Sequence, residues 1–372
     1  MEPTNRLNED EGRARAAVAR ARTRGPRLTD EHVTLAHGAG GKASAALVEQ
    51  VFLAGYGNAV LAEMTDAAVV GVAELVGDGA PGGERLAFST DSYVVDPLEF
   101  PGGSIGDLAV NGTVNDLAVM GARPQLLSAA FVLEEGLEIA VLRRVVAAMR
   151  DAAGAAGVRI VTGDTKVVPR GAAHRLFITT AGVGVIPAGR TLGAATVRPG
   201  DRLVVSGAIA DHGMAVMMAR GDLAIDAPIS SDTRAVNGLV EALLAAAPGA
   251  RWLRDATRGG LGTVLNELAR ATGLGVVVEE ERVRVHPMTR GACDLLGIDP
   301  LYVANEGTFV AVVPAAEADA AVAALRGQPG GAEAGVVGRI VAEPAASVVM
   351  VTAFGGTRLV DMLVGDPLPR IC

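Results

Sequence analysis

Short apolar runs and longer amphipathic stretches alternate through the first half of the chain. Residues 85–93, 129–133 and 177–186 have the apolar pattern of β-strands, whereas residues 104–119 and 139–156 repeat apolar side chains at helical spacing. Glycine closely follows each of the two predicted helices, which is typical of a helix end. The pattern therefore predicts a protein of the α/β (α+β) class.

The second half repeats this mixture of strands and helices. A strand ends at a turn near residue 207, and a Met-rich helix opens at residue 211. Further helices are expected at 235–246, 261–271 and 315–325, and further strands at 276–278, 335–341 and 348–352. We therefore expect four parts: an Arg-rich extension (1–32), an N-terminal domain (33–188), a C-terminal α/β domain (189–360) and a flexible tail (361–372).

Composition narrows the class of protein. The chain of 372 residues has a net charge of −9 and only 3% aromatic residues, so we expect no nucleic-acid partner. No apolar run reaches the roughly 18 residues of a membrane helix, and the charged start lacks the apolar core of a secretion signal. The only cysteines, Cys293 and Cys372, supply no disulfide framework. We therefore expect a cytoplasmic protein without a membrane partner.

Carboxylates recur where predicted strands end. Asp66, Asp91 and Asp164 lie beside apolar runs of the first half, Asp116 lies on a polar helix face, and Asp255 belongs to a glycine-rich loop of the second half. Such carboxylates suit Mg²⁺, which prefers oxygen ligands. Together with glycine-rich loops they indicate a metal–nucleotide site, in which cations bridge phosphate oxygens. The absence of a Cys/His cluster from the sequence disfavours zinc.

The chain contains only two lysines, and both lie in glycine-flanked polar motifs. Lys42 follows the glycine-rich residues 37–41 and precedes an apolar helical run, while Lys166 follows Gly163-Asp164-Thr165. A loop that leads into a helix offers backbone N–H groups to phosphate. The spacing around Lys42 is not that of a P-loop, and a flexible turn is equally consistent with it.

The last eight residues form a distinct segment. Residues 365–372 contain Pro367 and Pro369 and end in Cys372. Proline has a fixed φ and no N–H group, so the pattern predicts an extended strap that carries an accessible thiol. A frayed chain end that happens to finish in cysteine has the same pattern.

Several candidates also have a purely structural interpretation. Asp255 suits a helix N-cap, His212 a hydrogen-bonded loop residue, and Glu306 the partner of a surface salt bridge. Cys293 is expected to pack in the core as a small apolar side chain. The recurrence of carboxylates, rather than any one of them, favours a functional site.

Beyond these single features, the chain resembles one known family over about residues 33–372. The resemblance rests on residues 37–41 (HGAGG), 89–94 (STDSYV), 111–116 (NGTVND), 163–168 (GDTKVV), 254–260 (RDATRGG), 304–307 (ANEG) and 369–372 (PRIC). In these motifs the chain resembles the carbamoyl dehydratases HypE of nickel–iron hydrogenase maturation. The terminal motif separates that family from its relatives, the aminoimidazole ribonucleotide synthetases, selenophosphate synthetases and thiamine-monophosphate kinases.

The resemblance implies a two-domain aminoimidazole ribonucleotide synthetase-like fold. In a homodimer the N-terminal sheets would join into a barrel, with ATP and Mg²⁺ near the interface. The implied metal ligands are Asp66, Asp91, Asp116 and Asp255. The implied nucleotide-binding residues are Gly38, Gly40, Gly41, Lys42, Asp91, Asn111, Asp164 and Thr165. The implied catalytic residues are Cys372, which would carry the substrate, and Lys166, Glu306 or His212, one of which would act as the base.

The same resemblance implies a reaction and its partners. The carbamoyltransferase HypF would place a carbamoyl group on Cys372, and ATP-driven dehydration would convert that group into a thiocyanate. The HypC–HypD complex would then receive the cyano group for iron. Two alternatives stay open: a small-molecule kinase or synthetase of the same superfamily, and a carrier that senses nucleotide without catalysing the reaction.

Overall fold

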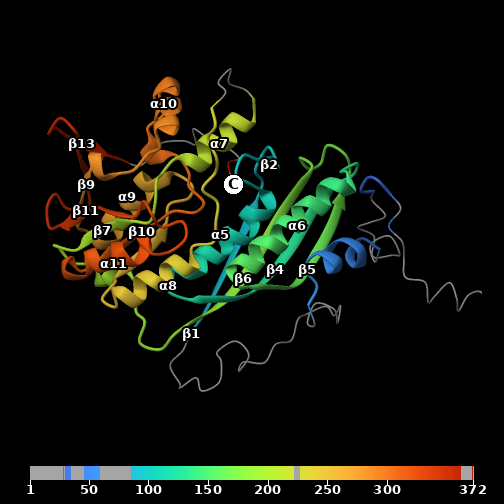
Figure 1. Ribbon diagram of the computed structural model, residues 1–372, viewed down its shortest axis with the longest axis horizontal. Coiled ribbons are helices and arrows are strands. Elements are labelled where there is room, and N and C mark those ends of the chain that lie inside the picture. The colour runs from blue at the N-terminus through green and yellow to red at the C-terminus, as the bar shows by residue number, and fades with distance from the viewer. Residues whose placement is uncertain are drawn as a thin grey trace, which may run out of the picture.

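A computed structural model of the chain (Figure 1) describes residues 28, 30–34, 46–58, 85–221, 227–361 and 371. Each half of the described chain forms one large β-sheet, and helix α5 (Ile105–Val119) lies between the two sheets. The mixed α/β class predicted from the sequence is confirmed. No helix in the described ranges is both long and apolar enough to cross a bilayer.

The first sheet has four strands in the order β1-β6-β4-β5. Their bounds are Arg85–Tyr93 for β1, Arg123–Glu134 for β4, Arg159–Val168 for β5 and Leu176–Ile186 for β6. The β1–β6 and β6–β4 pairs are antiparallel, whereas β4 and β5 are parallel. One face is covered by α5 and by α6 (Ile139–Ala156), and β1 and β5 are the outermost strands among the described residues.

Short elements flank this sheet. A π-helical turn η2 (Val48–Leu53) continues into α3 (Ala54–Tyr56), which packs on α6, and the hairpin β2 (Glu99–Phe100) and β3 (Gly103–Ser104) leads into α5.

The second sheet has seven strands in the order β13-β12-β9-β11-β7-β10-β8. The strands are β7 (Arg202–Val205), β8 (Trp252–Asp255), β9 (Gly275–Glu279), β10 (Phe309–Val313), β11 (Gly335–Val341), β12 (Val348–Val351) and β13 (Thr357–Val360). The helices are α7 (Asp211–Ala219), α8 (Asn237–Ala246), α9 (Gly260–Thr272), α10 (Pro287–Leu296) and α11 (Ala318–Arg326). Single 3-10 turns occur at η4 (Ala194–Thr196), η5 (Glu280–Arg282), η6 (Pro300–Tyr302) and η7 (Ala315–Glu317).

Local sequence fixes the ends of α5, the central helix. The Ser104 hydroxyl accepts hydrogen bonds from the backbone N–H groups of Gly106 and Asp107, which caps the N-terminus. At the other end Gly121 has a positive φ of 78°, a conformation that glycine adopts without strain. Nearly every side chain between these ends is buried, because α5 contacts α6 and the first sheet on one side and β8 and α8 on the other.

The polar residues of α5 join the two halves of the chain. The Asn115 amide donates to the carbonyls of Arg234 and Glu306, each at 3.0 Å, and its oxygen accepts from Val236 N–H at 2.8 Å. The Asn111 amide donates to the Thr233 hydroxyl at 3.2 Å. The polar helix face seen in the sequence is therefore an interface between the halves, in which buried amides find partners.

Two local predictions were wrong. Residues 163–166 were expected to follow a strand, yet Asp164 and Lys166 lie within β5, because an edge strand can expose polar side chains to solvent. Asp255 is the last residue of β8 and not a helix N-cap, a position that Gly259 occupies for α9.

Candidate active site

Four carboxyl groups from both halves of the chain converge beside α5. Asp91 comes from β1, Asp116 from α5, Asp255 from the end of β8, and Glu306 from the segment that precedes β10. We call these four residues the acidic cluster. Each of the other three raises the pKa of Glu306 by its charge, which places all four within electrostatic reach of one another.

The first pair of the cluster is held by hydroxyl groups. The Tyr93 hydroxyl donates to Asp91 Oδ2 at 3.2 Å, and the Ser89 hydroxyl donates to Asp116 Oδ2 at 2.7 Å. Ser89, Asp91 and Tyr93 alternate along β1, so all three side chains face α5. Gly112 of α5 allows this approach, because a Cβ atom there would collide with the Tyr93 hydroxyl.

Burial and like charge raise the pKa values of three members of the acidic cluster, Asp91, Asp255 and Glu306. Burial raises the pKa of Asp91 to about 6, and the adjacent Asp116 adds to the effect. Burial and Asp116 together raise the pKa of Asp255 to about 7. Glu306 is 3% exposed, and burial, followed by the nearby carboxylates, raises its pKa well above the usual range. Without a cation, part of the acidic cluster is therefore protonated near neutral pH.

Asp232 holds the segment that carries Glu306, and sequence reasoning missed it. Its carboxylate accepts from the backbone N–H groups of Glu306 at 2.9 Å and Gly307 at 3.0 Å, and from the Thr308 hydroxyl at 3.0 Å. A Cβ atom at Gly307 would collide with the Asp232 carbonyl, so the close approach requires glycine. The available signal was the uninterrupted polar run 230–234 ahead of a helix.

This donor set fits a hydrated cation better than a fully enclosed one. Within the described ranges, no group of three or more His, Cys, Asp or Glu side chains is arranged to hold a metal by itself. Mg²⁺ usually keeps several waters and takes one or two carboxylates together with substrate phosphates. Burial, with the charge of Asp116 added to it, raises the pKa values of Asp91 and Asp255, and a cation bound there would favour their ionised forms.

The structure does not bring Lys166 to the acidic cluster of the same chain. The Lys166 ammonium pairs with Asp164 Oδ2 at 2.8 Å, and both side chains are more than half exposed. Asp164 also accepts from Thr165 N–H at 2.8 Å. Strand β1, which carries Asp91, pairs with β6, β6 pairs with β4, and β4 pairs with β5. Asp91 and Lys166 are therefore about three strand spacings, or about 14 Å, apart across the sheet.

Three further candidates are described and do not belong to the cluster. Asn111 is buried and bonded to Thr233. His212 is fully buried at the start of α7, and Ile371, which is 4% exposed, accepts a hydrogen bond from it. Cys293 is buried in α10, as predicted, and burial raises the pKa of its thiol to about 11.

The other sequence-predicted site residues lie outside the described ranges. They are Gly38, Gly40, Gly41, Lys42, Asp66 and Cys372.

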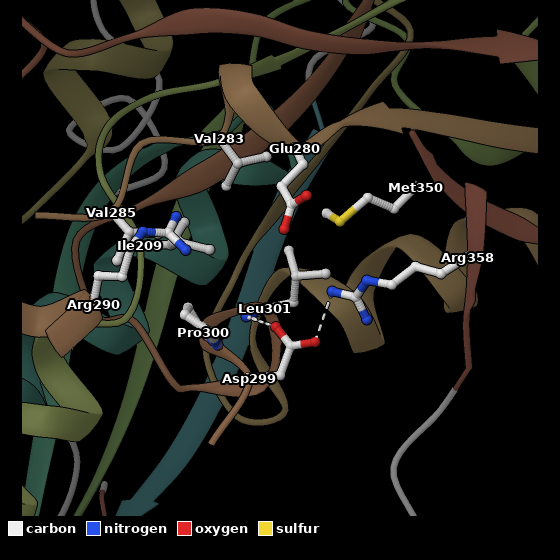
Figure 2. A pocket seen from close by; sticks show the side chains of 10 residues that line it. All are labelled: Ile209, Glu280, Val283, Val285, Arg290, Asp299, Pro300, Leu301, Met350 and Arg358. Carbon is white, nitrogen blue, oxygen red and sulfur yellow. Dashed lines mark hydrogen bonds and ion pairs between the residues drawn. The ribbon is translucent and has the colours of Figure 1, made fainter. Parts of the chain in front are cut away.

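A separate cavity of about 40 Å³ opens between α10 and the strands β12 and β13. Figure 2 shows Asp299 on its wall, where it accepts from Leu301 N–H at 3.0 Å and pairs with Arg358 at 2.7 Å. Glu280 and Arg290 also line it. None of the site residues predicted from the sequence lies on this wall, so the cavity is distinct from the acidic cluster.

Replacing Asp255 with asparagine is expected to stabilise the protein in the absence of nucleotide and metal. The folded state raises the pKa of Asp255 from 3.8 to about 7, so it binds the proton more tightly than the unfolded state does. The wild-type carboxyl therefore lowers the free energy of unfolding progressively as the pH rises from about 4 to 7. Above pH 7 this loss is complete. Asp255→Asn should raise the free energy of unfolding at pH 8, by at most about 4 kcal/mol, and by little near pH 4.

Urea unfolding at both pH values measures this effect. Asp294→Asn, at an exposed position in α10, is the matched control and should change little. Equal stability of the parent and Asp255→Asn at pH 8 would show that Asp255 is not strained by its neighbours.

Comparison with known proteins identifies the class to which this fold and site belong. Residues 64–186 match the N-terminal domain of AIR synthase related proteins, and residues 198–351 match their C-terminal domain. The chain is 58% identical over 348 residues to the carbamoyl dehydratase HypE of Rhodobacter capsulatus. The aligned region covers 93% of this chain and 99% of that protein. The chain belongs to the carbamoyl dehydratase HypE family, whose members are enzymes of hydrogenase maturation.

Solved structures agree with this membership. A crystal structure of hydrogenase maturation protein HypE in complex with ATP matches with a TM-score of 0.85 and 46% identity, covering 91% of this chain and 99% of that one. A HypE–HypF complex matches with a TM-score of 0.73 and 41% identity, covering 86% and 100%. The predicted family and enzyme class are confirmed, and the small-molecule kinase and non-catalytic carrier alternatives are not favoured.

Proposed function

We propose that this enzyme dehydrates a carbamoyl group carried on the sulfur of Cys372 and uses ATP to do so. The γ-phosphoryl group of ATP is transferred to the carbamoyl oxygen, and that oxygen then leaves as part of phosphate. The two N–H protons are also lost. The carbon then forms a triple bond to nitrogen, so that a thiocyanate remains on Cys372 beside ADP and phosphate. Phosphorylation is needed because the unactivated amide oxygen is a poor leaving group.

The acidic cluster is the observation that carries this proposal. The carboxyl groups of Asp91, Asp255 and Glu306, all with a raised pKa, meet beside Asp116. Ile371, the residue before the final cysteine, is packed in the core of the same molecule. A packed Ile371 is inconsistent with a simply frayed end. The match to a HypE structure with bound ATP supports nucleotide binding at this fold.

The carboxylates have a proposed role as ligands of Mg²⁺. Asp91, Asp116 and Asp255, with Asp66 from outside the described residues, would hold the ion. When bound, Mg²⁺ bridges phosphate oxygens and offsets carboxylate charge. Gly38, Gly40, Gly41 and Lys42 stay predicted as the segment that contacts phosphate, with Asn111, Asp164 and Thr165 as further nucleotide-binding residues.

Glu306 is the proposed base that removes an amide proton. It is nearly inaccessible to water, and its backbone is fixed on one side by Asp232 and on the other by Asn115. A carboxyl group with a raised pKa is a stronger base once ionised, and cations at the acidic cluster favour its ionisation. Exclusion of water also protects a phosphorylated intermediate from hydrolysis.

A homodimer is proposed because, among the described residues, no strand lies beyond β1 or β5 and no element covers the face of the first sheet opposite α5 and α6. Leu86 and Phe88 on β1 are 59% and 70% exposed, although both are large and apolar. Joining β1 of one copy to β5 of another would close the sheets into a barrel and cover these side chains. It would also place the partner's Lys166 beside β1, and a role for this lysine in catalysis requires that arrangement.

Replacing Phe88 with glutamate is expected to convert the dimer into monomers, because it introduces a charge where the proposed interface excludes water. Light scattering coupled to size exclusion measures the mass. Phe354→Glu, at a fully exposed apolar side chain of the second half, is the control and should stay dimeric. A parent protein that is monomeric at all concentrations would contradict the proposed dimer.

Partners and location are proposed from family membership. HypF is the proposed carbamoyl donor, supported by the match to a HypE–HypF complex, and the HypC–HypD complex is the proposed acceptor of the cyano group. A cytoplasmic location is proposed from the sparse cysteines. The domain boundaries 33–188 and 189–360 also stay a proposal, supported by the two matched domain families.

Intact-mass measurement tests the function directly. Protein carbamoylated by HypF is mixed with ATP and Mg²⁺, and one water mass should be lost per chain as ADP forms. An unchanged mass without ADP would contradict the proposed reaction and favour a carrier.

A further inference from the structure

His212 joins the end of the chain to the protein interior through both nitrogens of its ring. Its side chain is fully buried at the start of α7. Nδ1 lies 2.8 Å from the Ser231 hydroxyl, and Nε2 lies 3.0 Å from the carbonyl oxygen of Ile371. The Ile371 side chain is itself part of the main hydrophobic core.

These partners select one tautomer of the imidazole. The carbonyl oxygen of Ile371 can only accept, so Nε2 must carry the hydrogen and donate it. Nδ1 must then accept from the Ser231 hydroxyl, whose oxygen accepts in turn from Thr233 N–H at 3.1 Å. Burial lowers the pKa of His212, which favours the neutral ring that this chain of hydrogen bonds needs.

The ring is also held in place by its surroundings. The Phe100 ring of β2 meets it edge-on, with centroids 5.5 Å apart, and Figure 1 shows β2 beside α7. The residue before α7, Ala210, donates its N–H to Asn305 Oδ1 at 2.7 Å. A donor that is fixed on both its backbone and its ring loses little entropy on binding its acceptor.

The same short segment holds both the chain end and the acidic cluster. Ser231 orients His212, while the next residue, Asp232, accepts from the backbone N–H groups of Glu306 and Gly307. Adjacent Cα atoms are about 3.8 Å apart, so one rigid scaffold places the carbonyl of Ile371 relative to Glu306.

We propose that His212 is a positioning residue that seats the end of the chain by donating a hydrogen bond to the Ile371 carbonyl, and that Ser231 sets the tautomer it needs. The proposal rests on the proposed function of Cys372. With both ring nitrogens engaged, His212 has no free lone pair to accept a proton from substrate, so it acts on the reaction only by holding the peptide next to the reacting sulfur.

The two variants that test this proposal differ in one donor. His212→Leu fills the space of the imidazole ring without a hydrogen-bond donor, whereas His212→Gln offers an amide N–H at a similar distance from the backbone. Unmodified Cys372 is alkylated with iodoacetamide, and the site is assigned by peptide mapping. Cys293, which is buried, is the internal reference for an intact fold. Single-turnover dehydration of carbamoylated protein is measured in parallel.

His212→Leu should raise the alkylation rate of Cys372 about tenfold and slow dehydration by a similar factor, which is the loss expected for one hydrogen bond. His212→Gln should recover most of both rates, and Ser231→Ala should lie between. Nucleotide binding and the protection of Cys293 should stay unchanged, which separates loss of seating from unfolding.

Equal alkylation rates for Cys372 in the parent and His212→Leu would overturn the proposal. So would a failure of His212→Gln to recover the rates while Cys293 stays protected. If the parent itself does not dehydrate the carbamoyl group but the alkylation rates still differ, the proposed function fails and the seating role of His212 stands.

Discussion

Replacing Cys372 with alanine is expected to abolish the cyano adduct completely while leaving ATP binding unchanged. In the proposed function the thiolate of Cys372 accepts and carries the carbamoyl carbon, and alanine offers no nucleophile. After treatment with HypF as the carbamoyl donor and then with ATP and Mg²⁺, the parent should gain about 25 Da as the cyano group replaces the thiol hydrogen, and the variant should gain nothing. Intact-mass spectrometry measures the adduct, and calorimetry measures nucleotide binding.

Cys293→Ala provides the matched control for this experiment. Cys293 is buried in α10 and its thiol pKa is raised to about 11, so little of it is thiolate at neutral pH. This variant should form the adduct at the parental rate. An adduct mapped to Cys293, or a normal adduct in Cys372→Ala, would contradict the proposed function.

Replacing Glu306 with glutamine is expected to lower the dehydration rate by about 10²–10⁴-fold, the usual contribution of a general base. The amide has nearly the same shape but cannot accept the proton. The free energy of unfolding without nucleotide should stay equal or rise, because burial and the neighbouring carboxylates raise the pKa of Glu306. Because this pKa is raised, ionisation of Glu306 lowers the free energy of unfolding as the pH rises above 4.5. Glutamine cannot ionise and removes this effect.

Single-turnover kinetics and urea unfolding at pH 8 together measure the two effects. Glu281→Gln, at an exposed position, should change neither. A Glu306→Gln protein that retains the parental rate would place the base elsewhere, and one that loses stability would show that Glu306 is ionised and paired in the folded state.

Sequence patterns were sufficient to predict an element where its own residues mark both of its ends. The predicted strand 85–93 and helix 139–156 coincide with β1 (Arg85–Tyr93) and α6 (Ile139–Ala156). The helix has an amphipathic repeat and a glycine stop at Gly157, whose φ is 71°. Residues 163–166 of β5 were not predicted as strand, because their polar side chains suit either a turn or an exposed edge strand.

The candidate site shows where such signals run out. The sequence singled out Asp91, Asp116, Asp255 and Glu306 as separate residues, and their convergence was a hypothesis. Asp232 escaped notice, because its role is to bind the backbone of a segment far along the chain. A residue that serves a distant backbone has no spacing of its own in the sequence.

The sequence by itself determined the family, through seven short motifs, and the chemical identity of the groups that it carries, including the cysteine at position 372. Only the tertiary structure decided which carboxyl groups share a site, which of them resist ionisation, and that His212 faces the carbonyl of Ile371. The reason is physical. Desolvation and repulsion between charges depend on distances in space, and those distances are set by long-range packing around α5 rather than by neighbours along the chain.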